Sequence, residues 1–296
     1  MSLTLYQQIQ QFYDASSGLW EQIWGEHMHH GYYGPAGDRY KDRRQAQIDL
    51  IDVLLDWSQI GSASRILDVG CGIGGSSLYL AQKFQASVTG ITLSPVQANR
   101  ARERAIAAGL ETGQRDRTQG VLPHADFQVA NALEMPFDDD VFDLVWSLES
   151  GEHMPDKEQF LQECYRVLKP GGTFLLVTWC HRDTGLPGGA LTLSEQKHLA
   201  EIYRVYRLPY VVSLRDYVAI AHQVGFQSIR SDDWSAAVSP FWNAVIDSAL
   251  TPAAILGLLQ AGWTTIQAAL SMGLMRRGYQ RGLIKYGLLC ASKNRT

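Results

Sequence analysis

Apolar runs and helical patterns alternate along the middle of the chain. Short apolar segments bounded by turn residues are typical of buried strands, and the segments between them repeat apolar residues at helical spacing. We expect strands at residues 65–69, 86–93, 126–130, 142–146 and 173–179, and helices at residues 76–84, after Pro95 and up to Lys169. Strands that alternate with helices form a parallel sheet, so the pattern predicts an α/β core.

Further elements are expected on both sides of this core. Residues 3–24 predict a helix with a break at 16–18, and residues 42–57 predict an amphipathic helix that packs against the sheet. The remaining elements are helices at 194–205 and 214–224 and strands at 228–234 and 284–292. We therefore divide the chain into N-terminal helices with a lid segment (1–60), the core (61–180), a first lid insertion (181–226), and the last strands with a second apolar insertion at about 240–281 (227–296).

Composition and charge narrow the class of function. The chain of 296 residues has a net charge of −4, so it lacks the basic footprint of a nucleic-acid-binding protein. Its four cysteines form no C-x-x-C pair, which favours a reducing compartment and argues against a disulfide framework or a zinc site. The N-terminal residues combine no basic segment with an apolar run, so we expect neither a secretory signal nor a transit peptide, and a cytoplasmic location.

A glycine-rich turn, GCGIGG at residues 70–75, joins the first expected strand to its helix. Glycines there let the backbone bend tightly and let a ligand approach the main chain. The spacing Gly-x-Gly-x-x-Gly is also that of nicotinamide dinucleotide sites, in which an acid ends the next strand. Here that strand ends in Thr92-Leu93-Ser94-Pro95, without an acid. This ending disfavours a dinucleotide, while a plain strand-to-helix turn remains the other alternative.

The order of these elements resembles class I S-adenosylmethionine-dependent methyltransferases. The resemblance implies a Rossmann-like α/β sheet, mostly parallel with a late antiparallel strand. It also implies helices on both faces, an α-helical lid built from N-terminal and C-terminal insertions, and S-adenosylmethionine as the cofactor. The residues implied to bind this cofactor are Gly70, Gly72 and Gly74 under the methionyl part and the ribose, Asp68 and Ser147 at the methionyl part, Thr92, Leu93 and Gln97 at the ribose, and Asn131, Ala132 and Leu133 at the adenine.

Three candidates for acid–base chemistry follow a central strand, at the edge where ligands bind in open α/β sheets. They are His153, Glu152 and Glu149. A methyl acceptor must be a nucleophile, and a histidine or carboxylate of near-neutral pKa can remove a proton from it. We expect one of the three to act on the acceptor, although each is equally open to a structural role. The next candidates are three other histidines, His29, His30 and His181.

The segment His27-Met28-His29-His30 gathers three histidines in four positions. A metal site is disfavoured, because the spacing is not that of a helical site and no Cys/His cluster accompanies it. One interpretation is a turn packed by aromatic residues. The other is a lid segment over a ligand, with Tyr32 or Tyr33 facing the ligand. In either case we expect no metal.

Several segments carry a narrower resemblance, to gamma-tocopherol methyltransferases: residues 20–31, 145–157, 177–182 and 233–235 followed by 239–242. The resemblance spans nearly the whole chain. It implies C-methylation of the chromanol ring of gamma-tocopherol to alpha-tocopherol, and of delta- to beta-tocopherol, at a ring carbon activated by loss of the phenolic proton. Two alternatives remain. One is another small-molecule N- or O-methyltransferase, such as an indole-alkaloid N-methyltransferase. The other is a catalytically silent domain that binds the cofactor or a lipid.

Residues 249–275 contain no charged side chain and are followed by Arg276 and Arg277. The length would permit a membrane span, but its proline, glycines and glutamines favour a pair of buried or interfacial helices. We expect this insertion, including Leu258 and Leu259, to form a groove for the long tail of a tocopherol. We also expect a peripheral contact with a thylakoid or plasma membrane.

Overall fold

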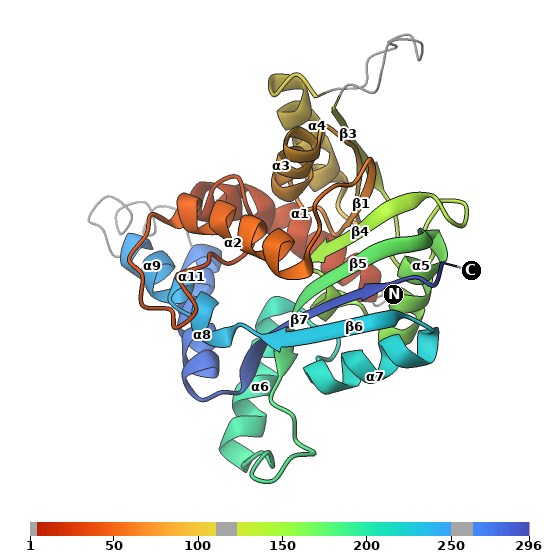
Figure 1. Cartoon of the computed structure of the whole chain (residues 1–296). Helices are drawn as coiled ribbons and strands as arrows, with labels where there is room; N and C mark the ends of the chain where they lie inside the picture. The colour runs from red at the N-terminus through yellow and green to blue at the C-terminus, as the bar shows by residue number, and fades with distance from the viewer. Residues whose placement is uncertain (1–4, 111–122, 250–262, 296) are drawn as a thin grey trace, which may run out of the picture.

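The computed structural model describes residues 5–110, 123–249 and 263–295 (Figure 1). Its seven strands form one sheet in the order β3-β2-β1-β4-β5-β7-β6. Neighbouring strands from β3 to β5 pair in parallel, whereas β7 pairs antiparallel with both β5 and β6. The strands are β1 (Arg65–Val69), β2 (Ser87–Thr92), β3 (His124–Val129), β4 (Phe142–Leu148), β5 (Leu168–His181), β6 (Gln227–Asp233) and β7 (Ile284–Ser292). The mostly parallel sheet with a late antiparallel strand is therefore confirmed.

Helices cover both faces of the sheet, because successive side chains of a strand point to opposite faces and both sets are apolar. In β4, Leu144 and Trp146 pack in the core shared with α2 and α3, whereas Val145 packs in the core shared with α5 and α7. The helices are α1 (Leu5–Trp24), α2 (Arg43–Ser58), α3 (Gly75–Phe84), α4 (Pro95–Ala107), α5 (Lys157–Val167), α6 (Leu193–Tyr206), α7 (Leu214–Val224), α8 (Ser235–Val238), α9 (Phe241–Ala249) and α11 (Trp263–Gln280), with a short 3₁₀ turn η1 (Gly151–His153).

Two local predictions are wrong. The break expected at residues 16–18 is absent, because α1 continues through it and the Ser17 hydroxyl donates to the Tyr13 carbonyl 2.6 Å away, one turn back in the same helix. The helix expected to run up to Lys169 ends at Val167 instead, and the following residues belong to β5, where Gly171 has φ +78° and its N–H donates to the Lys293 carbonyl. Tertiary pairing with the chain after β7 holds this segment extended.

The apolar insertion is only partly described. Residues 250–262, with Leu258 and Leu259, lie outside the described residues, so the expected tail groove does too. The helix α11 begins at Trp263, and from Met272 onward it packs into the core with Met275 and Tyr279. No helix in the described ranges combines the length and the apolar character needed to cross a membrane.

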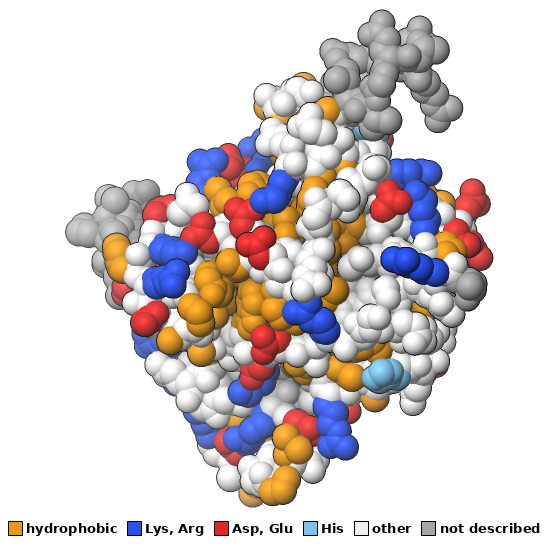
Figure 2. Space-filling model, in the orientation of Figure 1, with side chains coloured by type: hydrophobic (Ala, Val, Ile, Leu, Met, Phe, Trp, Pro, Cys, Tyr) orange, Lys and Arg blue, Asp and Glu red, His pale blue; other side chains and the backbone are white. Residues whose placement is uncertain are grey.

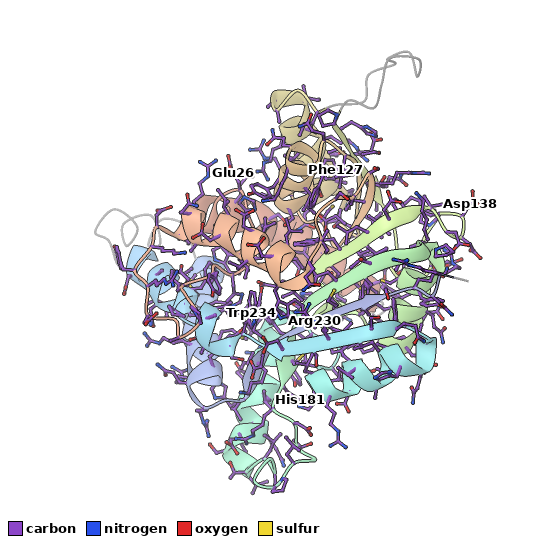
Figure 3. The ribbon with its side chains drawn as sticks, in the orientation of Figure 1. Glu26, Phe127, Asp138, His181, Arg230 and Trp234 are labelled. Carbon is purple, nitrogen blue, oxygen red and sulfur yellow. The ribbon has the colours of Figure 1, made fainter. Side chains whose placement is uncertain are left out.

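A patch of hydrophobic side chains lies near the middle of the face in Figure 2, close to the end of α2 and the end of β6. Trp234, which Figure 3 labels in the same region, belongs to a group of aromatic rings: its ring centroid lies 5.5 Å from that of Tyr32 and 6.1 Å from that of Trp57. The guanidinium of Arg230 lies over the ring of Trp57, with Arg230 and Trp234 labelled in Figure 3. Tyr32, expected as a candidate for facing a ligand, instead contributes to this outer surface.

Candidate functional site

The glycine turn between β1 and α3 is held between two other segments. A Cβ on Gly70 would lie 2.2 Å from the Cβ of Ser150, and one on Gly75 would lie 2.4 Å from the carbonyl oxygen of Glu26. A Cβ on Gly72, where φ is +53°, would meet only the Met28 sulfur at 3.7 Å. Gly70 and Gly75 therefore permit close packing, whereas Gly72 leaves room for a ligand.

A cleft of about 990 Å³ lies over the carboxyl ends of β1, β2, β3 and β4. This is the edge at which open α/β sheets bind ligands. Ten of the fourteen candidate residues predicted from sequence line it: Asp68, Gly70, Gly72, Thr92, Leu93, Gln97, Asn131, Ala132, Glu149 and His153.

The other four candidates lie beside the cleft. Gly74 faces away from it, since a Cβ there would lie 2.8 Å from the ring of Phe127, which Figure 3 labels. The backbone N–H of Leu133 donates to Asn131 Oδ1 at 3.0 Å, which shapes the turn after β3. The Ser147 hydroxyl lies 2.8 Å from that of Ser150 and supports the turn from below. Glu152 lines a second cavity, described below.

Polar groups at the cleft are fixed by local hydrogen bonds. The Ser77 hydroxyl donates to Asp68 Oδ2 at 2.6 Å, while burial raises the pKa of Asp68 to about 7. The Thr92 hydroxyl donates to Gln97 Oε1 at 2.8 Å, which leaves the Gln97 amide nitrogen as the donor of that side chain. The hydroxyl of Ser94 caps α4 by accepting from the Gln97 N–H.

The helix α1 covers the cleft. Tyr6, Ile9 and Tyr13 line it from this helix. Glu21 accepts two hydrogen bonds from Arg100 Nε and Nη2, and Ser94 donates to Asp14 Oδ1 at 2.5 Å. These contacts join α1 to α4. Sequence analysis missed Ile9 and Tyr13 as site residues, although their helical spacing marks one face of α1; the pattern does not show what that face covers.

A second cavity of about 450 Å³ adjoins the cleft and shares Tyr13, Met28, Glu149 and His153 with it. Its other lining residues are Trp24, Glu152, Trp179 and Tyr206. Aromatic walls with a few carboxylate, phenol and imidazole groups suit a flat aromatic ligand that carries one polar group.

Glu149 is saturated with hydrogen bonds. Its carboxylate accepts from the His30 N–H and Nδ1 at 2.7 and 2.9 Å, from Tyr286 at 2.7 Å and from Trp179 at 3.2 Å. Burial opposes its ionisation, but the hydrogen bonds and electrostatic influence of His30 outweigh burial and lower the pKa of Glu149. A carboxylate of low pKa with four donors is a structural anchor between the lid segment and β7 rather than a base.

Glu152 has the opposite character. Among the described side chains, Thr178 is the one that donates to its carboxyl group, at 2.7 Å, and burial together with the nearby charge of Glu149 raises its pKa to about 7. The ammonium of Lys157 donates to the backbone carbonyls of Gly151, Glu152 and Met154 and so fixes the turn that carries it. A fixed carboxylate that titrates near neutral pH is suited to general base catalysis.

His153 contacts α1 across the cleft. Its Nε2 lies 2.6 Å from the Tyr13 hydroxyl, and its buried Nδ1 has no hydrogen-bond partner among the described residues. Burial, with the charge of Lys157, lowers the pKa of His153 to about 3. The imidazole is therefore neutral at physiological pH and a much weaker base than Glu152.

The three histidines of the lid segment have separate environments. His30 binds Glu149, the rings of His27 and His29 pack edge to face with centroids 5.1 Å apart, and His29 lines the cleft. Over the described ranges, no three His, Cys, Asp or Glu side chains are grouped to hold a metal ion. Tyr33 is buried in the core, so neither it nor Tyr32 faces the cleft; Met28 and His29 do.

The sheet order, the glycine turn and the cleft over the strand ends together define an S-adenosylmethionine-dependent methyltransferase. A family model described as a methyltransferase domain matches residues 67–176. The chain is 46% identical to the chloroplastic tocopherol O-methyltransferase of Arabidopsis thaliana, over 96% of this chain and 81% of that protein. It therefore belongs to the tocopherol methyltransferase family, and its cofactor is S-adenosylmethionine.

Two other proteins place the chain in a wider group. It is 32% identical to ajmaline N-methyltransferase of Rauvolfia serpentina, over 96% of this chain and 97% of that protein. The crystal structure of geranyl diphosphate C-methyltransferase from Streptomyces coelicolor, in complex with S-adenosyl-L-homocysteine, superposes with a TM-score of 0.73. That match covers 99% of this chain and 98% of the other at 21% identity, so it demonstrates a common fold.

Proposed function

We propose that the protein transfers a methyl group from S-adenosylmethionine to a ring carbon of a tocopherol. Gamma-tocopherol would give alpha-tocopherol, and delta-tocopherol would give beta-tocopherol. The observation that carries the proposal is the 46% identity to a tocopherol O-methyltransferase across nearly the whole chain. The aromatic cavity beside the cofactor cleft supports it, since a chromanol is a flat ring with one phenol.

The cleft fits the cofactor. Gly72 leaves space at the turn, and Asp68, Gln97 and Asn131 line the same cleft. The buried carboxyl group of Asp68 is proposed to contact the methionyl ammonium. When bound, S-adenosylmethionine supplies an electrophilic methyl group on a sulfonium. The remaining tasks belong to the protein: it must orient the acceptor, take up its proton and exclude water.

Glu152 is proposed to take the phenolic proton. Its raised pKa and its place in the second cavity support this role. Loss of that proton raises the electron density on the ring carbon ortho to the oxygen, which then forms the new carbon–carbon bond while the sulfur–methyl bond breaks. The hydrogen of that carbon leaves as a proton afterwards and restores the phenol. His153 and Tyr13 are proposed to position the acceptor at the junction of the two cavities.

The atom that receives the methyl group decides between two outcomes. The name of the Arabidopsis relative specifies O-methylation, whereas we propose C-methylation, in which the phenol survives. Purified protein should be incubated with methyl-labelled cofactor and gamma-tocopherol, delta-tocopherol, a tail-less chromanol and an indole-alkaloid amine. We expect labelled products from both tocopherols. Each product should keep an oxidisable phenol and show a new aryl methyl signal by NMR. Transfer to the amine alone, or a methyl ether product, would overturn the proposal.

We also propose that the protein meets its long-tailed acceptor at a membrane surface, as a peripheral protein in the cytoplasm. The support is the chemistry of the proposed substrate, whose saturated tail partitions into bilayers. Flotation with liposomes that contain gamma-tocopherol should recover the protein with the lipid, and carbonate extraction should release it. Recovery in the soluble fraction under all lipid conditions would contradict a membrane contact.

A further inference from the structure

His29 lies on a segment that packs against the glycine turn and is fixed by hydrogen bonds. The segment that carries it runs from α1 to α2, and the amide nitrogen of Gln47, a buried residue of α2, donates to the carbonyls of His27 and His29 at 2.7 and 2.8 Å. Arg104 of α4 joins the same segment to the turn by donating to the carbonyls of Glu26 and Ile73. The His29 ring is therefore held in place from two helices, with Glu26 visible at the outer end of the segment in Figure 3.

The hydrogen bonds of His29 fix its tautomer. Its Nδ1 lies 2.8 Å from the carbonyl oxygen of His30. A carbonyl oxygen can only accept, so Nδ1 carries the proton. Burial lowers the pKa of His29, which keeps the ring neutral, and Nε2 therefore presents a lone pair.

That lone pair has no partner among the described residues. Nε2 is buried, and the exposed fraction of His29 as a whole is 4%. His29 lines the cofactor cleft but does not line the second cavity. A buried acceptor left unpaired is unfavourable, so its partner is expected to arrive with the ligand of the cleft.

We propose that His29 Nε2 accepts a hydrogen bond from the α-ammonium group of the methionyl part of the cofactor. A lone pair needs a donor, which excludes the cofactor's carboxylate. The ribose hydroxyls are donors too, but their expected partners, Thr92 and Gln97, lie at the second strand end. The neighbours of His29 in sequence, Met28 and His27, lie against Gly72 and Gly75 of the turn after the first strand. His29 thereby selects ligands that carry the amino acid end, as a second acceptor for the ammonium group beside Asp68. The inference concerns the cofactor and holds for any methyl acceptor.

The test compares two ligands and two variants. S-adenosylhomocysteine carries the amino acid end, and 5′-methylthioadenosine lacks it. In His29→Phe, which keeps a flat ring without the lone pair, calorimetry should show the Kd for S-adenosylhomocysteine rising about 10- to 100-fold, the range of one hydrogen bond to a charged group. The Kd for methylthioadenosine should change less than threefold. His27→Phe is the matched control, because His27 lies on the same segment and does not line the cleft; both affinities should stay near those of the parent.

Two further measurements keep the proposal open to refutation if His29→Phe does not fold. In the parent protein, the ¹⁵N signal of the unprotonated His29 Nε2 should shift on binding S-adenosylhomocysteine and stay in place with methylthioadenosine. The deaminated analogue of S-adenosylhomocysteine, which keeps the carboxylate, should also leave it in place. Equal losses for both ligands in the variant, or a signal that moves equally with all three ligands, would overturn the assignment. Since no acceptor is present, these results do not depend on the tocopherol proposal.

Discussion

The hydroxyl of Tyr13 lies 2.6 Å from Nε2 of His153, and the two residues are separated by 140 positions in the chain. This contact brings α1 into the site that the carboxyl ends of the strands form. Both side chains line both cavities, so they stand where the cofactor and the acceptor meet.

Replacing Tyr13 by Phe should therefore lower turnover more than it lowers binding. The variant leaves His153 Nε2 without its partner and removes one hydroxyl from the junction of the cavities. We expect kcat to fall about tenfold or more, the scale of one lost buried hydrogen bond, while the Kd for S-adenosylhomocysteine changes less than threefold. An equal loss in cofactor affinity would assign Tyr13 to the cofactor instead.

Glu152→Gln should remove the general base. Such a loss lowers rates by roughly 10²- to 10⁴-fold. In the parent protein, kcat at saturating cofactor should rise with pH through about 7, because the carboxyl group must be ionised to accept a proton and its pKa is about 7. The residual activity of the variant should lack this rise. A parent pH profile that stays flat between pH 6 and 8 would exclude Glu152 as the base.

The carboxyl group of Glu152 should also make the free energy of unfolding depend on pH. Its pKa is about 7 in the folded protein and 4.5 as the ordinary value, so between these values the folded state holds a proton that the unfolded state has released. The free energy of unfolding should therefore fall as pH rises across this window. Urea titrations of parent and Glu152→Gln should show a smaller pH dependence in the variant. Asp68, whose pKa is also raised to about 7, should contribute a further part of this pH dependence, equal in both proteins.

Glu149→Gln should destabilise the fold, in contrast to Glu152→Gln. The four donors that surround Glu149 would then face an amide nitrogen at one position, and the buried network would lose its charged acceptor. Leaving a buried donor unsatisfied costs about 1–3 kcal/mol, and more where a charged group is involved. Urea unfolding at pH 7.5 should show a loss of this order for Glu149→Gln and little or no loss for Glu152→Gln. Similar losses in both variants would contradict the separate roles assigned here.

Two glycines of the turn should respond differently to substitution. Gly72→Val places a side chain in the cleft and should abolish binding of S-adenosylhomocysteine in a folded protein. Gly74→Ala places its methyl group against Phe127 on the other side of the turn, so it should lower the thermal midpoint with little effect on the affinity. Calorimetry and thermal unfolding of both variants test the pair. Retained affinity in Gly72→Val would show that the cofactor does not pass over this glycine.

The cofactor side of the site could be predicted from the sequence to a large extent. Thr92 ends an apolar strand, Asn131 and Glu149 each come just after one, and parallel strands bring such positions to one edge. Gly74 was placed on the wrong side of the turn, because sequence spacing does not specify which glycine faces the ligand. That distinction depends on the ring of Phe127, a residue of β3.

The acceptor side could not be resolved in the same way. Glu149 and Glu152 are three positions apart, and donors from distant parts of the chain, His30, Trp179 and Tyr286, distinguish the anchor from the proposed base. Likewise, apolar residues repeat at helical spacing in the sequence of α1 and indicate an apolar face. The position of this face over the cleft depends on contacts such as Glu21–Arg100, which join distant parts of the chain.

The alkylation rate of Cys71 can report whether the cofactor cleft is occupied. All four cysteines are free and buried, and Cys71 is the one among them that lines the cofactor cleft. Burial raises the pKa of its thiol, so alkylation at neutral pH should be slow. An alkylating reagent must enter the cleft to reach this sulfur and compete there with the cofactor for space. The rate of modification at Cys71 thus measures how much of the enzyme is loaded, without any label being engineered into the chain.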